Sequence, residues 1–369
     1  MGQLRRSGVS ERGLHFVVPG PLEQRTGGYL YDARMVEGLR ARGWTVRVHN
    51  LDGAFPDGDA TARRSLEVTL AHFDDGALVV IDGLAMGGLP GPIEAHARRL
   101  RIVSLLHHPL ADETGLSEPR RQALVQSERA ALAPCRGVIV TSVYTAHRLR
   151  DYGVAPDRCR PVPPGTEPAP LADGPPVGSP PLLLCVATVT PRKGHDVLAS
   201  SLARVRDLPW RCVCAGSLER DPAFAERVLR SVRDEGLEDR VEFVGEHGPE
   251  ALQQLYHESS LFVLASHYEG YGMALAEAIA RGLPVVSTTG GAIPWTVPED
   301  ASLLVPPADV DAFATALRLV LAPDAAQRRE ALAAAARRHA GTLPDWPASV
   351  ALFEEAVRAF AGSPGAFES

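Results

Sequence analysis

The stretch from Leu261 to Gly291 reads LFVLASHYEGYGMALAEAIARGLPVVSTTGG, and it decides the fold. It begins with a short apolar run, LFVLAS, and closes with a second one, PVVST, before its final glycines. Between them, residues 273–281 have the small, mostly apolar composition of a buried helix. Two apolar strands joined by a helix predict neighbouring parallel strands in an α/β sheet.

The same alternation of strands and helices extends over most of the chain. In the first half the predicted strands are LHFVV (14–18), TVRVHN (45–50), ALVVID (77–82), RIVSLLH (101–107) and GVIVT (137–141), with helices over 30–42 and 120–133. In the second half they are PLLLCVATV (181–189), WRCVCAG (210–216) and RVEFVG (240–245), with helices from about 193 and 222 and, at the end, near 309–321, 324–339 and 347–361. Near-continuous apolar strands separated by helices are typical of parallel sheets covered on both faces.

A segment crowded with proline and glycine, PVPPGTEPAPLADGPPVGSPP (161–181), interrupts this alternation. We therefore predict an N-terminal Rossmann-like domain over 1–168, a linker over 169–181 and a C-terminal domain over 182–345. The helix in 346–369 is expected to pack back on the N-terminal domain. Because open parallel sheets bind ligands at the carboxyl ends of their strands, we expect the site in the cleft between the two domains.

Composition and charge exclude several classes of protein. With 38 basic and 45 acidic residues, the chain has a net charge of −7, which argues against a nucleic-acid-binding protein. Its apolar stretches fall short of the ~20 residues that cross a bilayer. The segment MGQLRRSGVSERG (1–13) lacks an apolar core, so we expect no secretory signal and a cytoplasmic location. The arginines of 98–101 are interpreted as a solvated edge rather than a peripheral membrane contact.

The five cysteines are scattered along the chain. Cys212 and Cys214 share one face of a predicted strand, because residues two apart in a strand point the same way. A metal site needs two such pairs, or histidines at ligand spacing, and the sequence shows neither. We therefore expect buried free thiols and no metal ion.

The chain has a single lysine, Lys193, and its other 37 basic residues are arginines. A lysine that is retained against such a bias indicates a role for a compact point charge, such as contact with a phosphate. Lys193 follows Arg192 in VATVTPRKGHDVL (186–198), where a strand ends and a helix begins. Two cations at an exposed helix start predict a phosphate site, and replacing Lys193 is expected to leave the fold intact.

Two glutamates stand in the stretch that decides the fold. Glu269 lies in the loop after LFVLAS, where Gly270 and Gly272 allow a ligand to approach the main chain. Glu277 lies among small apolar residues of the following helix, so a buried carboxylate there requires hydrogen-bond donors. The vicinal hydroxyls of a ribose would supply them; alternatively, Glu277 is exposed or paired with Arg281.

The spacing of Glu269 and Glu277, the run PRKGHDVL and the later GLPVVSTTGG resemble glycosyltransferase family 4. In the N-terminal half, TGGYLYDARMVEGLRARGWTV (26–46), HHPLADETGL (107–116) and PVPPGT (161–166) resemble further segments of that family. The resemblance covers nearly all of the chain. It implies a GT-B fold, in which two Rossmann-like doubly wound domains face each other across a cleft.

The resemblance also implies a role for individual residues. Lys193 would neutralise the donor diphosphate as it leaves, and Glu277 would accept the ribose hydroxyls. His108 would sit beside the anomeric carbon, with His107 as a competing assignment because strand register is uncertain by a residue. Glu269 would hold the donor sugar together with the amides of the loop, and the remaining donor contacts would be Gly27, Gly28, Thr188, Arg192, Gly245, Glu246, Gly270, Tyr271 and Gly272.

The sequence departs from the family pattern at two positions. Many members carry a glycine and an arginine where this chain has Ala187 and Thr188, so Arg192 is expected to supply that charge from another position. Trp295 stands where an acidic residue is common, and we assign it no role.

The implied reaction is the retaining transfer of a hexosyl group from a nucleotide-sugar, UDP- or GDP-linked, to an acceptor hydroxyl. The acceptor is a glycan, a lipid-linked glycan or a small molecule. Attack occurs on the face that the diphosphate leaves, and no metal or other cofactor is required; Asp57 and Asp59 are interpreted as turn residues. A catalytically silent GT-B protein that serves as a binding or scaffold subunit is the alternative.

Two other nucleotide-binding classes do not fit. A nicotinamide-dependent oxidoreductase would have G-x-G-x-x-G after the first strand, and PGPLEQRTGG (19–28) lacks that spacing. A P-loop nucleotidase is excluded because its lysine is followed by serine or threonine, whereas Lys193 is followed by glycine.

Overall fold

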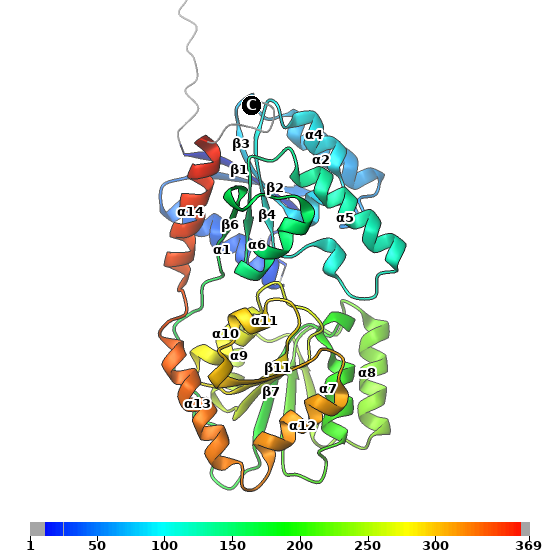
Figure 1. Cartoon of the computed structure of the whole chain (residues 1–369), viewed down its shortest axis with the longest axis vertical. Helices are drawn as coiled ribbons and strands as arrows, with labels where there is room; N and C mark the ends of the chain where they lie inside the picture. The colour runs from blue at the N-terminus through cyan, green and yellow to red at the C-terminus, as the bar shows by residue number, and fades with distance from the viewer. Residues whose placement is uncertain (1–11, 25, 363–369) are drawn as a thin grey trace, which may run out of the picture. The chain divides into compact units, whose positions relative to one another are not determined.

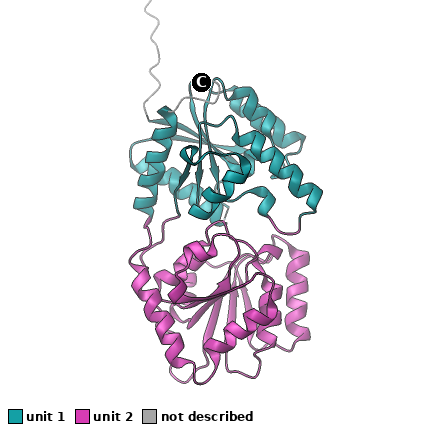
Figure 2. Cartoon of the chain, in the orientation of Figure 1, with its two compact units in different colours: residues 1–112, 116–163, 346–369 teal, residues 113–115, 164–345 magenta. Residues whose placement is uncertain are grey.

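The computed structural model describes residues 12–24 and 26–362. It divides into two compact units (Figure 2). Of the described residues, unit 1 comprises 12–24, 26–112, 116–163 and 346–362, and unit 2 comprises Glu113–Gly115 and Pro164–Asp345. Residues 1–11, on which most of the secretory-signal argument rests, lie outside the described residues, as do residues 363–369.

Unit 1 is a parallel sheet of six strands with flanking helices (Figure 1). The strand order is β2-β1-β3-β4-β5-β6, and the strands are β1 Gly13–Pro19, β2 Thr45–Leu51, β3 Leu78–Asp82, β4 Arg101–Leu106, β5 Gly137–Val140 and β6 Cys159–Pro161. The helices are α1 Gly27–Ala41, α2 Ala60–Ala71, α3 Gly83–Met86, α4 Pro90–His96, α5 Glu118–Leu132, α6 Val143–Arg148 and α14 Trp346–Gly362, with 3₁₀ turns η1 Leu110–Asp112, η2 Leu149–Tyr152 and η3 Pro156–Arg158.

Unit 2 is a second six-stranded parallel sheet, in the order β12-β11-β10-β7-β8-β9. Its strands are β7 Leu182–Val186, β8 Arg211–Ala215, β9 Val241–Gly245, β10 Leu261–Leu264, β11 Val285–Thr288 and β12 Ser302–Val305. Its helices are α7 His195–Ala203, α8 Pro222–Asp234, α9 Pro249–His257, α10 Met273–Ala280, α11 Ile293–Thr296, α12 Val310–Leu321 and α13 Ala326–Ala340, with 3₁₀ turns η4 Pro191–Lys193 and η5 Glu299–Ala301.

Both sheets have the strand order of doubly wound folds, which confirms the predicted fold class. In such a sheet the chain winds outward in two directions from one pair of strands, and the loops that follow this pair diverge. The pair is β1 and β3 in unit 1, and β7 and β10 in unit 2. A ligand site is therefore expected at the carboxyl ends of these strands, within each unit.

The predicted strands are all present, and the structure adds two, β6 and β12. Both are short edge strands, which pair on one side only and carry little of the continuous apolar pattern that marks a central strand. Helix α1 begins at Gly27 rather than at residue 30, so the glycines of the first loop form its first turn. Helix α7 begins at His195, after a 3₁₀ turn that contains Lys193.

The structural boundary between the units falls before the predicted one. Residues 164–181 form no helix or strand, yet they group with unit 2 because their main chain is bonded to it. Thr166 N donates to Pro344 O (2.8 Å), and Ala172 N donates to Arg281 O (2.9 Å). The chain is therefore anchored to unit 2 well before the predicted end of the linker at 181.

Helix α14 belongs to unit 1, although it follows unit 2 in the sequence. A Cβ at Gly38 of α1 would lie 2.3 Å from the side chain of Val350, so glycine permits the close packing of these two helices. The buried carboxylate of Glu354 pairs with Arg42 and accepts a hydrogen bond from Trp44 Nε1 (3.0 Å). Within the described part of the chain, no helix is both long enough and apolar enough to cross a membrane.

Candidate functional site

In unit 2, the loops that follow β7 and β10 lie against each other at the carboxyl edge of the sheet. His267 N donates to Arg192 O (2.7 Å), which joins the two loops through their main chains. Gly194 has φ 66°, and a Cβ at this position would lie 2.1 Å from Ala265 O. Only glycine fits there, so Gly194 permits the close approach that brings the PRKG turn to the loop containing Glu269.

Lys193 and Glu269 form a largely buried ion pair. Lys193 Nζ donates to Glu269 Oε1 (2.6 Å), and Ser266 Oγ donates to the same oxygen (2.8 Å). Arg192 Nη1 donates to Tyr268 O (2.9 Å) and lies 3.5 Å from Glu269 Oε2. Burial opposes charge on Glu269, but Lys193 and Arg192 hold the pKa of its carboxyl below the usual value.

This pair changes the interpretation of Lys193. The sequence placed it at an exposed helix start, whereas its side chain is only 18% exposed and its partner Glu269 is 5% exposed. The difference arises because the β10 loop covers the turn, which no local pattern reveals. Removal of the ammonium group would leave a buried carboxylate without its closest partner, so an undisturbed fold is no longer expected.

Glu277 lies on α10 and is half-buried. Tyr256 OH donates to its Oε2 (3.0 Å), and burial raises the pKa of the Glu277 carboxyl. Arg281 Nη1 donates to the main-chain oxygen of Glu277 (3.0 Å), and its guanidinium lies 4.4 Å from the centre of the Tyr256 ring. The tyrosine is thus a donor to this carboxylate that the sequence did not predict, since Tyr256 comes from α9.

The loop between Glu269 and α10 is braced by a later segment. Ala292 N donates to Glu269 O (2.8 Å), and Thr296 Oγ1 donates to Tyr271 O (2.6 Å). Gly272, at the N-cap of α10, has φ 95° and no side chain to cap the helix. The first amides of α10 therefore favour an anionic ligand.

The other residues predicted in unit 2 lie at the ends of neighbouring strands. Thr188 is half-buried two residues after β7, Gly245 ends β9 with φ 71°, and Glu246 is exposed immediately after it. Gly216 N donates to Gly245 O (2.8 Å), which ties the ends of β8 and β9 together. These residues thus line the same carboxyl edge as Lys193, because β7, β8 and β9 are adjacent parallel strands.

In unit 1, three polar side chains from separate elements meet at the carboxyl edge of the sheet. His107 Nε2 lies 3.1 Å from Asp32 Oδ1 and 3.3 Å from Asp82 Oδ2. Both carboxylates are buried, and Asp82 also accepts a hydrogen bond from Leu84 N (2.6 Å). Burial opposes charge on the imidazole, but the two carboxylates raise the pKa of His107 to about 10. The two carboxylates therefore favour the protonated imidazole, while burial and the charge of Asp82 raise the pKa of Asp32 to about 7.

The geometry favours His107 over His108 as the histidine beside the glycines. A Cβ at Gly28 would lie 3.3 Å from the His107 ring, and the three atoms nearest to it all belong to that ring. Gly27 and Gly28 form the first turn of α1, whose N-cap Thr26 makes no capping hydrogen bond with its side chain. Asp32 and Asp82 were not predicted, although Asp82 ends an apolar strand and could have been noticed there.

Two family models match the chain. Residues 180–322 match the model described as glycosyl transferases group 1, and residues 75–169 match Glycosyltransferase Family 4. The D-inositol 3-phosphate glycosyltransferase of Saccharomonospora viridis is 30% identical over 269 residues, which cover 67% of this chain and 61% of that protein. The lipopolysaccharide core biosynthesis mannosyltransferase LpsB of Rhizobium meliloti is 33% identical over 36% of this chain and 39% of that protein. The chain spans about three fifths of the first two curated relatives it matches.

Solved structures share the whole fold. Sucrose-phosphate synthase from Thermosynechococcus elongatus has a TM-score of 0.78 at 25% identity, over 93% of this chain and 98% of that one. The Anabaena protein HepE in complex with UDP and glucose has a TM-score of 0.70 at 17% identity, over 93% and 98% of the two chains. The second likeness concerns the fold alone.

Proposed function

The chain belongs to the family 4-type glycosyltransferases of GT-B fold, and we propose that it transfers a hexosyl group from a nucleoside-diphosphate sugar to an acceptor hydroxyl with retention of anomeric configuration, releasing the nucleoside diphosphate. The observation that carries the proposal is the Lys193–Glu269 ion pair at the carboxyl edge of β7 and β10. There the fold places two cations, glycine amides and a carboxylate at the ligand-binding edge of the sheet.

The cations of this edge suit the leaving diphosphate. Arg192 and Lys193 both contact Glu269 in the free protein, so a phosphate that arrives there competes for cations that are already positioned. Charge on the diphosphate grows as the glycosidic bond breaks, so a nearby ammonium group stabilises the transition state more than the ground state. As Lys193 turns to the phosphate, Glu269 becomes able to accept hydroxyls of the donor sugar.

The remaining residues of unit 2 suit the nucleoside. Glu277 Oε2 is held by Tyr256, which leaves Oε1 for a ribose hydroxyl. Burial raises the pKa of the Glu277 carboxyl, so its charged form is disfavoured in the free protein. Hydrogen-bond donors from a bound ribose would favour the charged form. We assign the base to the end of β9, near Gly245 and Glu246, and a phosphate or sugar contact to Thr188.

In unit 1, we propose that His107 supplies a positive hydrogen-bond donor to the sugar. Asp32 and Asp82 keep the imidazole charged and oriented, and the amides of Gly27 and Gly28 bind the diphosphate or the sugar beside it. The acceptor hydroxyl attacks on the face that the diphosphate leaves, and a phosphate oxygen takes its proton. Our proposal requires no metal ion at the reacting atoms.

A donor screen by thermal shift tests this proposal, with UDP-, GDP-, ADP- and dTDP-sugars. A correct donor at about 100 times its Kd stabilises by ~2.7 kcal/mol, which corresponds to roughly 5–10 °C for a domain of this size. UDP-glucose is the first candidate, because HepE was solved with UDP and glucose. Inositol phosphate belongs in the acceptor panel, because several relatives are named D-inositol 3-phosphate glycosyltransferases.

Turnover with each donor is then measured as the release of nucleoside diphosphate, and Arg318→Ala serves as the control variant. Arg318 is an exposed cation of unit 2 that pairs with Asp207, far in sequence from the motif, and its replacement is expected to leave turnover unchanged. No thermal shift and no turnover with any donor would favour the silent binding or scaffold subunit instead.

A further inference from the structure

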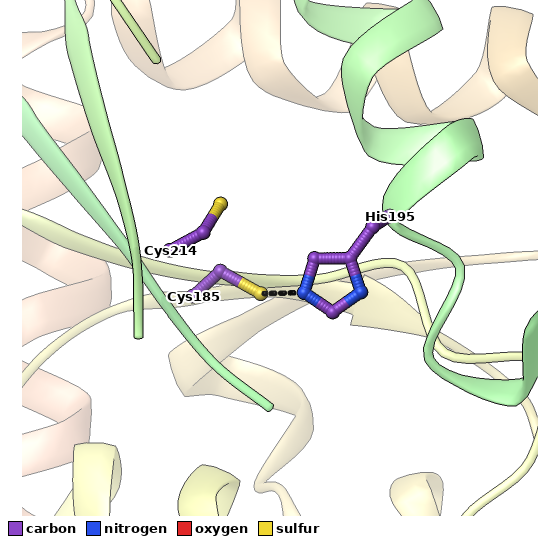
Figure 3. Close-up of side chains that lie close together, drawn as sticks. All are labelled: Cys185, His195 and Cys214. Carbon is purple, nitrogen blue, oxygen red and sulfur yellow. Dashed lines mark hydrogen bonds between the residues drawn. The ribbon is translucent and has the colours of Figure 1, made fainter. Parts of the chain in front are cut away.

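Three side chains that can bind a metal meet inside unit 2, beneath the turn that contains Lys193. Cys185 comes from β7, Cys214 from β8 and His195 from the first turn of α7 (Figure 3). Their ligand atoms all lie within 4.8 Å of one another, and Cys185 Sγ is 3.7 Å from His195 Nε2. All three residues are buried.

The fold assembles this group from positions that have no motif spacing. Cys185 and Cys214 are register partners in adjacent parallel strands, so their side chains point to the same face of the sheet. Helix α7 connects these two strands and covers that face, which brings His195 over both sulfurs. Spacing along the chain did not reveal that a histidine lies near these cysteines, because strand register and the packing of α7 bring them together.

The hydrogen bonds of the free protein satisfy this histidine poorly. The contact of its Nε2 is a thiol at 3.7 Å, and thiols are weak hydrogen-bonding groups. Its Nδ1 is buried without a hydrogen-bond partner in the described structure. Nε2 therefore has no strong hydrogen-bond partner in the free protein, and it is the ring nitrogen that lies against the Cys185 sulfur.

We propose that Cys185, Cys214 and His195 bind a structural Zn²⁺ ion. Zinc–sulfur bonds of ~2.3 Å and zinc–nitrogen bonds of ~2.0–2.1 Å in a tetrahedron place sulfur and nitrogen ~3.6 Å apart. The observed separation of 3.7 Å fits this value without a change in the backbone. Two thiolates and an imidazole are a donor set that prefers zinc over calcium or magnesium, which take oxygen ligands.

Zinc in structural sites is four-coordinate, so a fourth ligand completes the site. Cys212 lies on the same face of β8, two residues before Cys214, but it is not among the residues whose ligand atoms lie within 4.8 Å of one another. The ion would join β7, β8 and the first turn of α7, which begins two residues after Lys193.

The second group of metal-binding side chains in the described residues is Asp32, Asp82 and His107. There the imidazole already lies between two buried carboxylates, at 3.1 and 3.3 Å. His107 thus has two carboxylate partners, whereas the contact of His195 Nε2 is a thiol. The zinc proposal therefore concerns the cysteine group alone, and it does not depend on the proposed transferase activity.

Metal analysis of the full chain tests the proposal. The protein is expressed in medium with added Zn²⁺, dialysed against metal-free buffer without chelator, and measured by inductively coupled plasma mass spectrometry. We expect about one zinc per chain, and less than about a tenth of that in Cys185→Ser and Cys214→Ser. Cys135→Ser is the matched control, because Cys135 is also a buried free thiol but lies in unit 1, with its Sγ donating to Ala131 O (3.3 Å). It is expected to keep the full zinc content.

Cobalt substitution keeps the test decisive if the serine variants do not fold. Wild-type protein prepared with Co²⁺ is expected to show the thiolate charge-transfer band and the visible bands of tetrahedral cobalt. Wild-type chain without zinc or cobalt after this loading would overturn the proposal. Equal loss of zinc from the Cys135→Ser control would overturn it as well.

Discussion

Replacing Lys193 by alanine separates the stability of the ion pair from its role in catalysis. In the structure Lys193 Nζ is 2.6 Å from Glu269 Oε1, and the pair is largely buried. At an effective dielectric constant of 20, charges at this distance attract by roughly 6 kcal/mol before desolvation is subtracted. Losing one partner of a buried pair costs ~3–5 kcal/mol. Because Arg192 and Ser266 still contact Glu269, we expect the lower end of that range, ~3 kcal/mol.

The double variant Lys193→Ala/Glu269→Gln distinguishes the two effects. The neutral amide no longer requires a cation, so we expect most of the lost stability to return in the double variant. Turnover is expected to fall at least ~100-fold in both variants, because neither supplies an ammonium group to the leaving diphosphate. The single Glu269→Gln variant completes the double-mutant cycle.

Urea unfolding and release of nucleoside diphosphate measure these two quantities. The chain has four tryptophans, and Trp210 is the one buried in the core of unit 2, so its fluorescence is followed in a background with the other three replaced by phenylalanine. Turnover of Lys193→Ala within about threefold of wild type would refute the phosphate assignment, whose expected cost is at least ~100-fold. If the double variant were as unstable as Lys193→Ala, the ion-pair argument would be refuted. The role of Lys193 in catalysis would then be judged from the turnover measurements alone.

Three further predictions follow from other parts of the structure. Glu277→Gln is expected to weaken binding of the free nucleoside diphosphate about 10- to 100-fold in calorimetry, since a hydrogen bond to a charged group contributes ~1.5–3 kcal/mol; unchanged affinity would contradict the ribose assignment. Hydrogen bonds from Arg42 and Trp44 lower the pKa of Glu354 from 4.5 to about 2, so the stabilising effect of its carboxylate is present above pH 4.5 and is lost as the pH falls through 2. Glu354→Gln should therefore be less stable than wild type by ~1–2 kcal/mol at pH 7, and by less at pH 3. The same difference at both pH values would refute this account. His107→Gln is expected to lose at least ~100-fold in turnover while His108→Gln stays within about tenfold, and the reverse order would restore the first assignment.

The strand and helix pattern of this chain was predictable from local sequence. Central parallel strands are buried on both faces, so runs such as LFVLAS and GVIVT show as continuous apolar segments without knowledge of their neighbours. The edge strands β6 and β12 lack this signal, because one side of each is unpaired. The segment 164–181 forms no helix or strand, as predicted, but its attachment to unit 2 escaped prediction, since it depends on main-chain bonds with residues more than a hundred positions away.

The sequence by itself determined the two parallel sheets and the glycines that allow tight loops, because composition and short-range spacing encode these features. The residues of the predicted donor site came from the resemblance to glycosyltransferase family 4, and their roles stay predictions. Only the tertiary structure decided which charges meet. It paired Lys193 with Glu269, placed His107 between Asp32 and Asp82, and gathered Cys185, His195 and Cys214 in one core. The residues of each group come from loops or elements that meet at the edge or on the face of a sheet. The distances between their side chains follow from strand order and register rather than from separation along the chain.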